Sequence, residues 1–147
     1  MSSKPNSEDT IRIGFICVQN AGRSQMSTAF AEHERERRGL DHVEVLTGGT
    51  DPADSIHEEV LEVMSEAGID LSHRQPREIT VDELRSCAYV ATMGCSTLDV
   101  GDVGEDVDVR DWALDDPDSK DFDRVREIRD EIESRVGALF DEIETAE

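Results

Sequence analysis

Long apolar runs, aromatic residues and lysine are all scarce in this sequence. No apolar run approaches the roughly 18 residues of a membrane-spanning helix, so we expect no membrane span. Aromatic residues make up only 4% of the chain, too few to build a wide aromatic binding surface. The first ten residues are polar and lack an apolar centre, so we predict no signal peptide. These absences favour a location in the cytoplasm.

Cysteine is scarce as well: Cys17, Cys87 and Cys95 are an odd number at irregular spacing. They form no disulfide framework and match no zinc motif, and in the cytoplasm we expect reduced thiols. The four histidines are scattered, without the spacing of metal ligands: His33, His42, His57 and His73. We therefore expect neither a metal nor another cofactor.

Basic residues are few against 36 acidic ones, which gives the chain a formal net charge of −21. A field this negative repels nucleic acid and anionic membranes, so we expect neither as a partner. Strong acidity is also typical of disordered chains, but periodic apolar segments run through most of this sequence. We hypothesise instead that the protein is adapted to high salt, where screening shortens the range of its self-repulsion.

Apolar segments alternate between the patterns of strands and of helices. Ile11–Cys17 is an apolar run with a central glycine, typical of a buried parallel strand. The expected strands cover residues 11–17, 43–47, 88–93 and 107–110, and the expected helices cover 24–38, 55–67 and 122–144. A short helix through Leu84 would be capped by Thr80 or Asp82. We expect the first helix to bury a face ending at His33, and the last a face beginning at Phe122.

This alternation predicts an α/β fold with a mostly parallel sheet. No internal repeat and no domain-splitting linker is visible. We expect a disordered lead-in at residues 1–10 and a single domain over residues 11–147.

The most informative segment follows the first strand and leads into the first helix. It reads Cys17-Val-Gln-Asn-Ala-Gly-Arg23-Ser24. A loop in this position wraps backbone N–H groups around an anion and points the helix N-terminus at it. We therefore predict an oxyanion site formed by Val18, Gln19, Asn20, Ala21, Gly22, Arg23 and Ser24.

The side chains of this loop suit nucleophilic chemistry. The field at the helix N-terminus favours the thiolate of Cys17, which makes it a nucleophile near neutral pH. The planar fork of Arg23 suits two oxygens of phosphate or arsenate. Gly22 would permit a positive φ, and Ser24 could hydrogen-bond the thiolate. The alternative is a buried cysteine that merely ends a strand, but the strand–loop–helix context favours a functional loop.

A second candidate segment runs from Asp111 to Pro117, just beyond the fourth strand. The carboxyl ends of parallel strands gather where α/β sheets bind ligands. Asp116 precedes a proline, which holds it away from the αR conformation. It could act as general acid for a leaving oxygen. An ordinary surface turn explains the Asp-Pro pair equally well.

Taken in order, the strand, the Cys-x5-Arg-Ser loop, the helix and the late Asp-Pro resemble the low-molecular-weight protein tyrosine phosphatase superfamily. The segments CVQNAGRSQMS, GGTDPADSIHEEVLEVMSEAGIDLSHRQP, ATMGC and DWALDDP are similar to its arsenate reductase branch. The resemblance covers about residues 11 to 143 and implies a three-layer fold, with a four-stranded parallel sheet flanked by helices. It also implies roles for Cys17 as nucleophile, Asn20 and Ser24 as loop organisers, Arg23 as oxyanion ligand and Asp116 as acid.

The resemblance leaves two reactions open. Tyrosine phosphatases place aromatic residues after the Asp-Pro to wall the phenol ring, whereas Asp118 and Ser119 stand there in this sequence. Asp118 would also repel an anionic peptide, and the single tyrosine, Tyr89, falls inside an expected strand. We therefore favour arsenate, a small inorganic oxyanion, as substrate. The alternatives are a phosphatase acting through a phosphocysteine and an oxyanion-sensing module without turnover.

Arsenate reduction needs a second thiol, and Cys95 matches the resolving cysteine of the reductases. After Cys17 attacks arsenate, such a thiol displaces arsenite and leaves a disulfide. Many thioredoxin-coupled reductases carry a further cysteine a few residues later, and residues 96–101 contain none. The expected reductant is thioredoxin, a glutaredoxin-like protein or a low-molecular-weight thiol. Cys87 begins the third strand, about 20 Å from the carboxyl end of that strand and toward the opposite edge of the sheet. We expect its side chain to be a small buried hydrophobe.

The net charge generates a first prediction. If self-repulsion opposes folding, the protein melts at a higher temperature in molar KCl than in dilute buffer, by roughly 3 to 6 °C for one or two kcal/mol of relief. Thermal unfolding followed by circular dichroism at both salt concentrations measures this difference. Equal melting temperatures would rule out the adaptation to high salt.

Overall fold

A parallel sheet of four strands, in the order β2-β1-β3-β4, forms the centre of the molecule. The strands are β1 (Ile11–Cys17), β2 (Val43–Gly49), β3 (Tyr89–Met93) and β4 (Asp108–Asp111). The computed structural model describes residues 10–93, 107–112, 114 and 121–146, so all of the expected lead-in but Thr10 lies outside the described residues. Within the described part of the chain, the strands fall where the sequence predicts them, to within two residues at each end.

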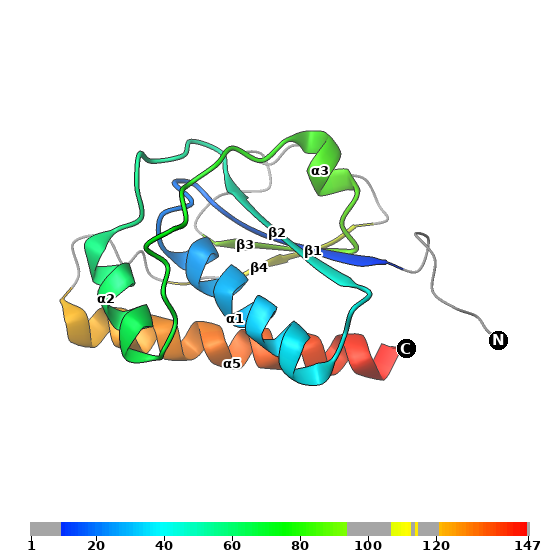
Figure 1. Ribbon diagram of the computed structural model, residues 1–147. Helices are drawn as coiled ribbons and strands as arrows, with labels where there is room; N and C mark the ends of the chain where they lie inside the picture. The colour runs from blue at the N-terminus through cyan, green and yellow to red at the C-terminus, as the bar shows by residue number, and fades with distance from the viewer. Residues whose placement is uncertain (1–9, 94–106, 113, 115–120, 147) are drawn as a thin grey trace.

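Helices cover both faces of this sheet (Figure 1). The helices α1 (Arg23–Arg38), α2 (Glu58–Glu66) and α5 (Phe122–Ala146) lie on one side, and the short α3 (Val81–Arg85) lies on the other. The predicted three-layer α/β fold is therefore confirmed. None of the described helices is both long and apolar enough to cross a membrane.

The central strand β1 divides two apolar clusters because its side chains alternate between the faces of the sheet. Ile13 and Phe15 are fully buried in the larger cluster, which includes residues of α1, α2 and α5. Ile16 belongs to the smaller cluster on the side of α3, together with Cys87. This arrangement fixes the face toward which the last residue of β1, Cys17, points: it lies in the larger cluster.

Two predicted faces are wrong at their ends. His33 is exposed on α1, although the apolar positions before it are buried. Phe122 is 45% exposed at the first turn of α5, where the guanidinium of Arg126 lies 5.9 Å from its ring centroid. Periodicity alone therefore overestimates the buried face at both positions.

Helix boundaries follow local chemistry closely. Thr80 caps α3 through a reciprocal capping box with Glu83, as one of the two expected caps. The helix α2 begins at Glu58, three residues after the expected start at residue 55. The backbone of residues 50–57 has other partners, described below, which explains the delayed start.

An ion-pair cluster joins the last turns of α1 and α5. Arg38 is only 13% exposed at its side chain, and its guanidinium contacts Glu34 at 2.7 Å, Asp141 at 3.0 Å and Glu144 at 2.5 Å. It also lies 5.8 Å from the ring centroid of Phe140. Because one planar guanidinium serves several carboxylates, arginine suits this junction better than lysine would. The hydrogen bonds to these carboxylates raise the pKa of Arg38 despite its burial, so the charge is present at all working pH values.

Gly49, the last residue of β2, generates a second prediction. A Cβ atom there would lie 2.5 Å from the carbonyl oxygen of Val18, in the loop after β1. Gly49→Ala must therefore shift backbone, and we expect it to lower the free energy of unfolding by about 1–3 kcal/mol. The matched control is Gly137→Ala in α5, where nothing lies within 4 Å and where alanine stabilises a helix by up to about 1 kcal/mol.

Chemical unfolding of both variants in molar KCl measures the two effects. Equal stability of the Gly49→Ala variant and the parent would mean that the loop and β2 are not packed this closely.

Candidate active site

The loop between β1 and α1 lies at the carboxyl edge of the sheet. Cys17 ends β1 and pairs in register with Gly49 of β2 and Met93 of β3. The helix α1 begins at Arg23, so five residues connect the sulfur to the helix. Cys17 is 2% exposed. The carboxyl edge is where parallel α/β sheets bind their ligands, so the loop stands in the position expected of a site.

The segment 50–57 runs alongside this loop and occupies its carbonyl oxygens. Backbone N–H groups of the segment donate to successive loop carbonyls: Thr50 to Cys17 at 3.3 Å, Asp51 to Val18 at 2.8 Å, Ala53 to Gln19 at 2.9 Å and His57 to Ala21 at 3.1 Å. We call residues 50–57 the clasp. Four of the loop's peptide planes are thereby oriented by one neighbouring segment.

The orientation of the carbonyls determines where the loop N–H groups point. In a trans peptide the N–H is directed away from the preceding C=O, and the described chain has no cis bond. The N–H groups of Val18, Gln19, Asn20 and Gly22 therefore face away from the clasp. Asn20 demonstrates this, because its N–H donates to the sulfur of Cys17 at 3.1 Å. No hydrogen bond within the described part of the chain uses the N–H of Gln19 or of Gly22.

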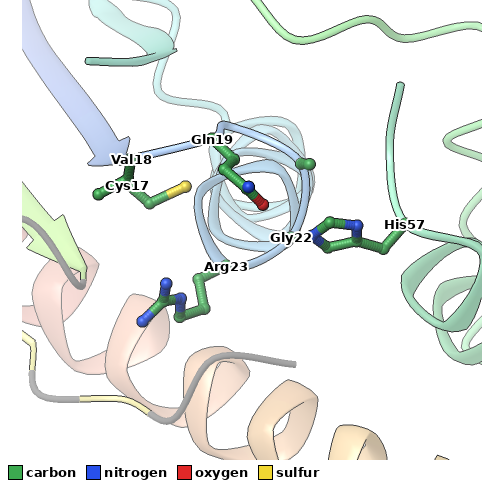
Figure 2. A pocket seen from close by; sticks show the side chains of 7 residues that line it. Cys17, Val18, Gln19, Gly22, Arg23 and His57 are labelled. Atoms are coloured by element: carbon green, nitrogen blue, oxygen red, sulfur yellow. The ribbon is translucent and has the colours of Figure 1, made fainter. Parts of the chain in front are cut away.

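These N–H groups surround a cavity of about 230 Å³. Its lining residues are Cys17, Val18, Gln19, Ala21, Gly22, Arg23 and His57 (Figure 2). A concave site lined by backbone donors at a helix N-terminus is suited to an anion. Its size fits a small tetrahedral oxyanion better than an extended ligand.

Asn20 holds the loop in shape with its backbone and its side chain. It has φ 54, the only positive value at a non-glycine residue in the described chain. Its amide nitrogen donates to the hydroxyls of Ser24 at 2.7 Å and Thr47 at 2.9 Å. Its amide oxygen accepts from the side chain of Gln25 and from the N–H of Arg77, both at 3.0 Å. Gly22 would permit a positive φ, but its φ is −143, and the left-handed residue is Asn20.

The sulfur of Cys17 lies in a polar environment despite its burial. The hydroxyl of Ser24 is 2.9 Å from it, and the N–H of Asn20 is the second donor. It also lies at the N-terminal end of α1, in the positive field of the helix. Hydrogen bonds and a positive field both stabilise a thiolate over a thiol. The arrangement is therefore chemically able to hold a nucleophilic sulfur next to an anion.

Arg23 lines the same cavity from the first turn of α1. It is 8% exposed, and one of its terminal nitrogens donates to the carbonyl of Leu114 at 3.0 Å. This bond ties the guanidinium to the chain that follows β4. A guanidinium with one edge fixed in this way loses less rotational freedom when it binds a second group.

Two of the predicted catalytic residues, Cys95 and Asp116, lie outside the described residues. Each follows a segment that ends close to the loop: Cys95 comes two residues after Met93, and Asp116 comes two residues after Leu114. Their roles stay predictions.

His57 is the residue of the cavity that the sequence did not point to as a site residue. It lies in a segment that resembles the arsenate reductase branch, but the sequence assigns it no role, and it stands 40 positions from Cys17 at the end of the clasp. The structure brings it to the cavity wall through the hydrogen bond from its N–H to Ala21. Only this tertiary contact identifies it.

Cys87 is separated from the site. It is 4% exposed in the cluster on the α3 side, before the first residue of β3, whereas Cys17 ends β1 at the other edge. Burial raises the pKa of its thiol to about 11. The thiol is therefore neutral at physiological pH, and a neutral thiol is a poor nucleophile.

The chain is similar to known proteins over most of its length. A sequence model of the family described as low molecular weight phosphotyrosine protein phosphatase matches residues 12–147. A Halobacterium salinarum protein named "Putative arsenate reductase" is 67% identical over 138 residues, which cover 93% of this chain and 96% of that protein. A Synechocystis protein named glutaredoxin arsenate reductase is 27% identical over 136 residues, which cover 90% of this chain and 98% of that protein.

Among solved structures, the thioredoxin-dependent arsenate reductase of Corynebacterium glutamicum superimposes with a TM-score of 0.75 at 36% identity. The match covers 94% of this chain and 64% of that one, so the present chain spans about two thirds of its length.

The contacts of Asn20 generate a third prediction. Asn20→Ala removes the amide and leaves a side chain at a positive φ, and we expect it to cost about 2–4 kcal/mol of stability and most of the affinity for phosphate. Asn20→Gly also removes the amide but tolerates the backbone conformation, so it should be about 1 kcal/mol more stable than the alanine variant. Urea unfolding and phosphate titration measure both quantities. If the alanine variant matched the parent in both, the loop would not depend on this residue.

Proposed function

The chain belongs to the low molecular weight phosphotyrosine protein phosphatase family, and on this premise we propose that it is an arsenate reductase that uses Cys17 as its nucleophile. The observation that carries the proposal is the cavity that Cys17, Arg23 and the loop between them line, with the N–H of Asn20 donating to the Cys17 sulfur. The 67% identity to the Halobacterium salinarum protein favours arsenate over a phosphoester as substrate.

In the first step the Cys17 thiolate attacks arsenate, and an As–O bond breaks as an As–S bond forms. The loop N–H groups and the guanidinium of Arg23 hold the remaining oxygens and offset their charge. The departing oxygen leaves as water, with a proton that we assign to Asp116. No oxidation state changes in this step.

The second step transfers two electrons. The thiolate of Cys95 attacks the sulfur of Cys17, the As–S bond breaks, and its electron pair stays with arsenic, which leaves as arsenite. Cys17 and Cys95 are left as a disulfide. Two external thiol groups, from one dithiol or two monothiols, return two electrons to this disulfide, are themselves oxidised to a disulfide, and restore the enzyme.

The reductant is a thiol, and three classes fit: thioredoxin, a glutaredoxin-like protein or a low-molecular-weight thiol. The Corynebacterium glutamicum relative is described as thioredoxin-dependent, and the Synechocystis relative is named a glutaredoxin arsenate reductase. Residues 96–101 contain no third cysteine, which favours direct reduction of the disulfide or attack of a small thiol on the arsenic adduct. A reducing cytoplasm supplies such donors, and a role in arsenical resistance would follow from arsenite production there. The similarity to the Halobacterium protein is consistent with adaptation to high salt.

Phosphoester hydrolysis is the second candidate, because the family is named for it. The same nucleophile would form a phosphocysteine, which water would then hydrolyse. Cys95 would have no part in this reaction. The two candidates therefore differ in their requirement for one residue.

Parallel assays of the purified protein in molar KCl test the proposal. With arsenate and a thioredoxin or small-thiol system, we expect consumption of reductant that falls at least about a thousandfold in Cys17→Ser and in Cys95→Ser. Cys87→Ala is the matched control, since its buried neutral thiol takes no part, and it should keep its turnover. Full arsenate turnover in Cys95→Ser would disprove the resolving role. Hydrolysis of an aryl phosphate at equal rates by the parent and Cys95→Ser, with no arsenate turnover, would establish the phosphatase instead.

A further inference from the structure

His57 is an ionisable residue in the wall of the cavity that we propose to bind the substrate. Its backbone N–H is bonded to the carbonyl of Ala21, so its position relative to the loop is fixed. Its imidazole is half-buried in the cavity wall. Figure 2 shows the ring reaching toward the loop from the side opposite to Cys17, with Gly22 between them.

The imidazole has no structural task within the described part of the chain. His57 is the N-cap residue of α2, but its side chain makes no capping hydrogen bond. No hydrogen bond or ion pair of the ring with any described residue is formed. The ring nitrogens are therefore available to hydrogen-bond with water or with a ligand. The adjacent cavity is the place where such a ligand would bind.

His57 lies between two hollows whose lining residues carry different charges. On the side away from the loop, a groove of about 630 Å³ also has His57 in its wall. The charged groups of this groove are carboxylates from α2 and from the residue before α5: Glu58, Glu59 and Asp121. On the loop side, His57 lines the same cavity as Cys17 and Arg23. His57 therefore separates an acidic groove, which repels anions, from the cavity that we propose to bind one.

We propose that the protonated imidazole of His57 is a second cationic ligand of the oxyanion, across the cavity from Cys17 and in addition to Arg23. The proposal rests on the oxyanion-binding part of the proposed function and adds a residue to it. An imidazolium N–H donating to an anionic oxygen forms a charge-assisted hydrogen bond, whereas the neutral ring offers at most a weaker one. Histidine changes charge between about pH 5 and 8, so binding at this site depends on pH in a way that Arg23 cannot produce.

Sulfate is the suitable probe, because it is tetrahedral and keeps its charge over this pH range, unlike phosphate and arsenate. Binding is measured by calorimetry between about pH 5.5 and 8.5 in molar KCl. All proteins carry Cys17→Ser, since deprotonation of a thiol would itself repel sulfate at high pH. Three are compared: Cys17→Ser alone, Cys17→Ser with His57→Gln, and Cys17→Ser with His33→Gln. His33 is the matched control because it is exposed on α1 and does not line the cavity.

We expect the sulfate affinity of the Cys17→Ser protein to fall about tenfold as the pH rises, as loss of one charge-assisted hydrogen bond would produce. His57→Gln should bind about tenfold more weakly at the acidic end and show little dependence on pH. His33→Gln should follow the Cys17→Ser profile. If His57 had only a structural role, His57→Gln would weaken sulfate binding equally at every pH.

Coincident pH profiles of the His57→Gln protein and its parent would overturn the proposal, as would a uniform weakening. Failure of the parent to bind sulfate at the acidic end would overturn it together with the anion site itself. Arsenate turnover in the otherwise unaltered enzyme is independent of these outcomes, so a failure of the reductase assignment is distinguishable from a failure of the role of His57.

Discussion

The hydrogen bonds from the clasp to the loop are the constraint on which the rest of the site depends. Carbonyl oxygens at the carboxyl edge of a strand would ordinarily face whatever lies beyond the sheet, and an anion would be repelled by them. Bonds from Thr50, Asp51, Ala53 and His57 take up the carbonyls of the loop on one side. Planar trans peptides then direct the N–H groups to the other side. An anion site thus arises from backbone geometry before any side chain contributes charge.

The same constraint accounts for features that look unrelated. Gly49 has no side chain because β2 must approach the loop closely enough to begin the clasp. The helix α2 begins only at Glu58 because His57, whose N–H donates to Ala21, has an extended backbone with ψ 139. Asn20 adopts a left-handed conformation because the chain must turn within five residues from β1 into α1. Its amide links the loop to β2 through Thr47 and to the segment after α2 through Arg77, so several elements hold one turn.

The fold and the position of the loop could be predicted from the sequence. The roles of Asn20 in the backbone turn and of His57 in the cavity wall could not, for physical reasons. The strand β1 and the loop after it are encoded locally, in an apolar run followed by the Cys-x5-Arg spacing. Glycine is the default for a positive φ and Gly22 would permit one, but the left-handed residue is Asn20. Asparagine also tolerates that region when its side chain can form hydrogen bonds nearby. The side chain of Asn20 forms four hydrogen bonds, and two of its partners, Thr47 and Arg77, lie far away in sequence. His57 reaches the site only through a contact across 36 residues, and no local pattern encodes it.

A strongly acidic protein that binds an oxyanion must create a positive region within its own negative field. Here the positive contributions are few and concentrated: aligned N–H groups, the N-terminus of α1 and the buried guanidinium of Arg23. Burial strengthens each of them because fewer water molecules screen their fields. High salt weakens the long-range repulsion from the surface carboxylates while leaving these short-range contacts largely intact. Adaptation to salt and binding of an anion are therefore compatible, since the same screening that stabilises the acidic surface also lets an anion approach the cavity.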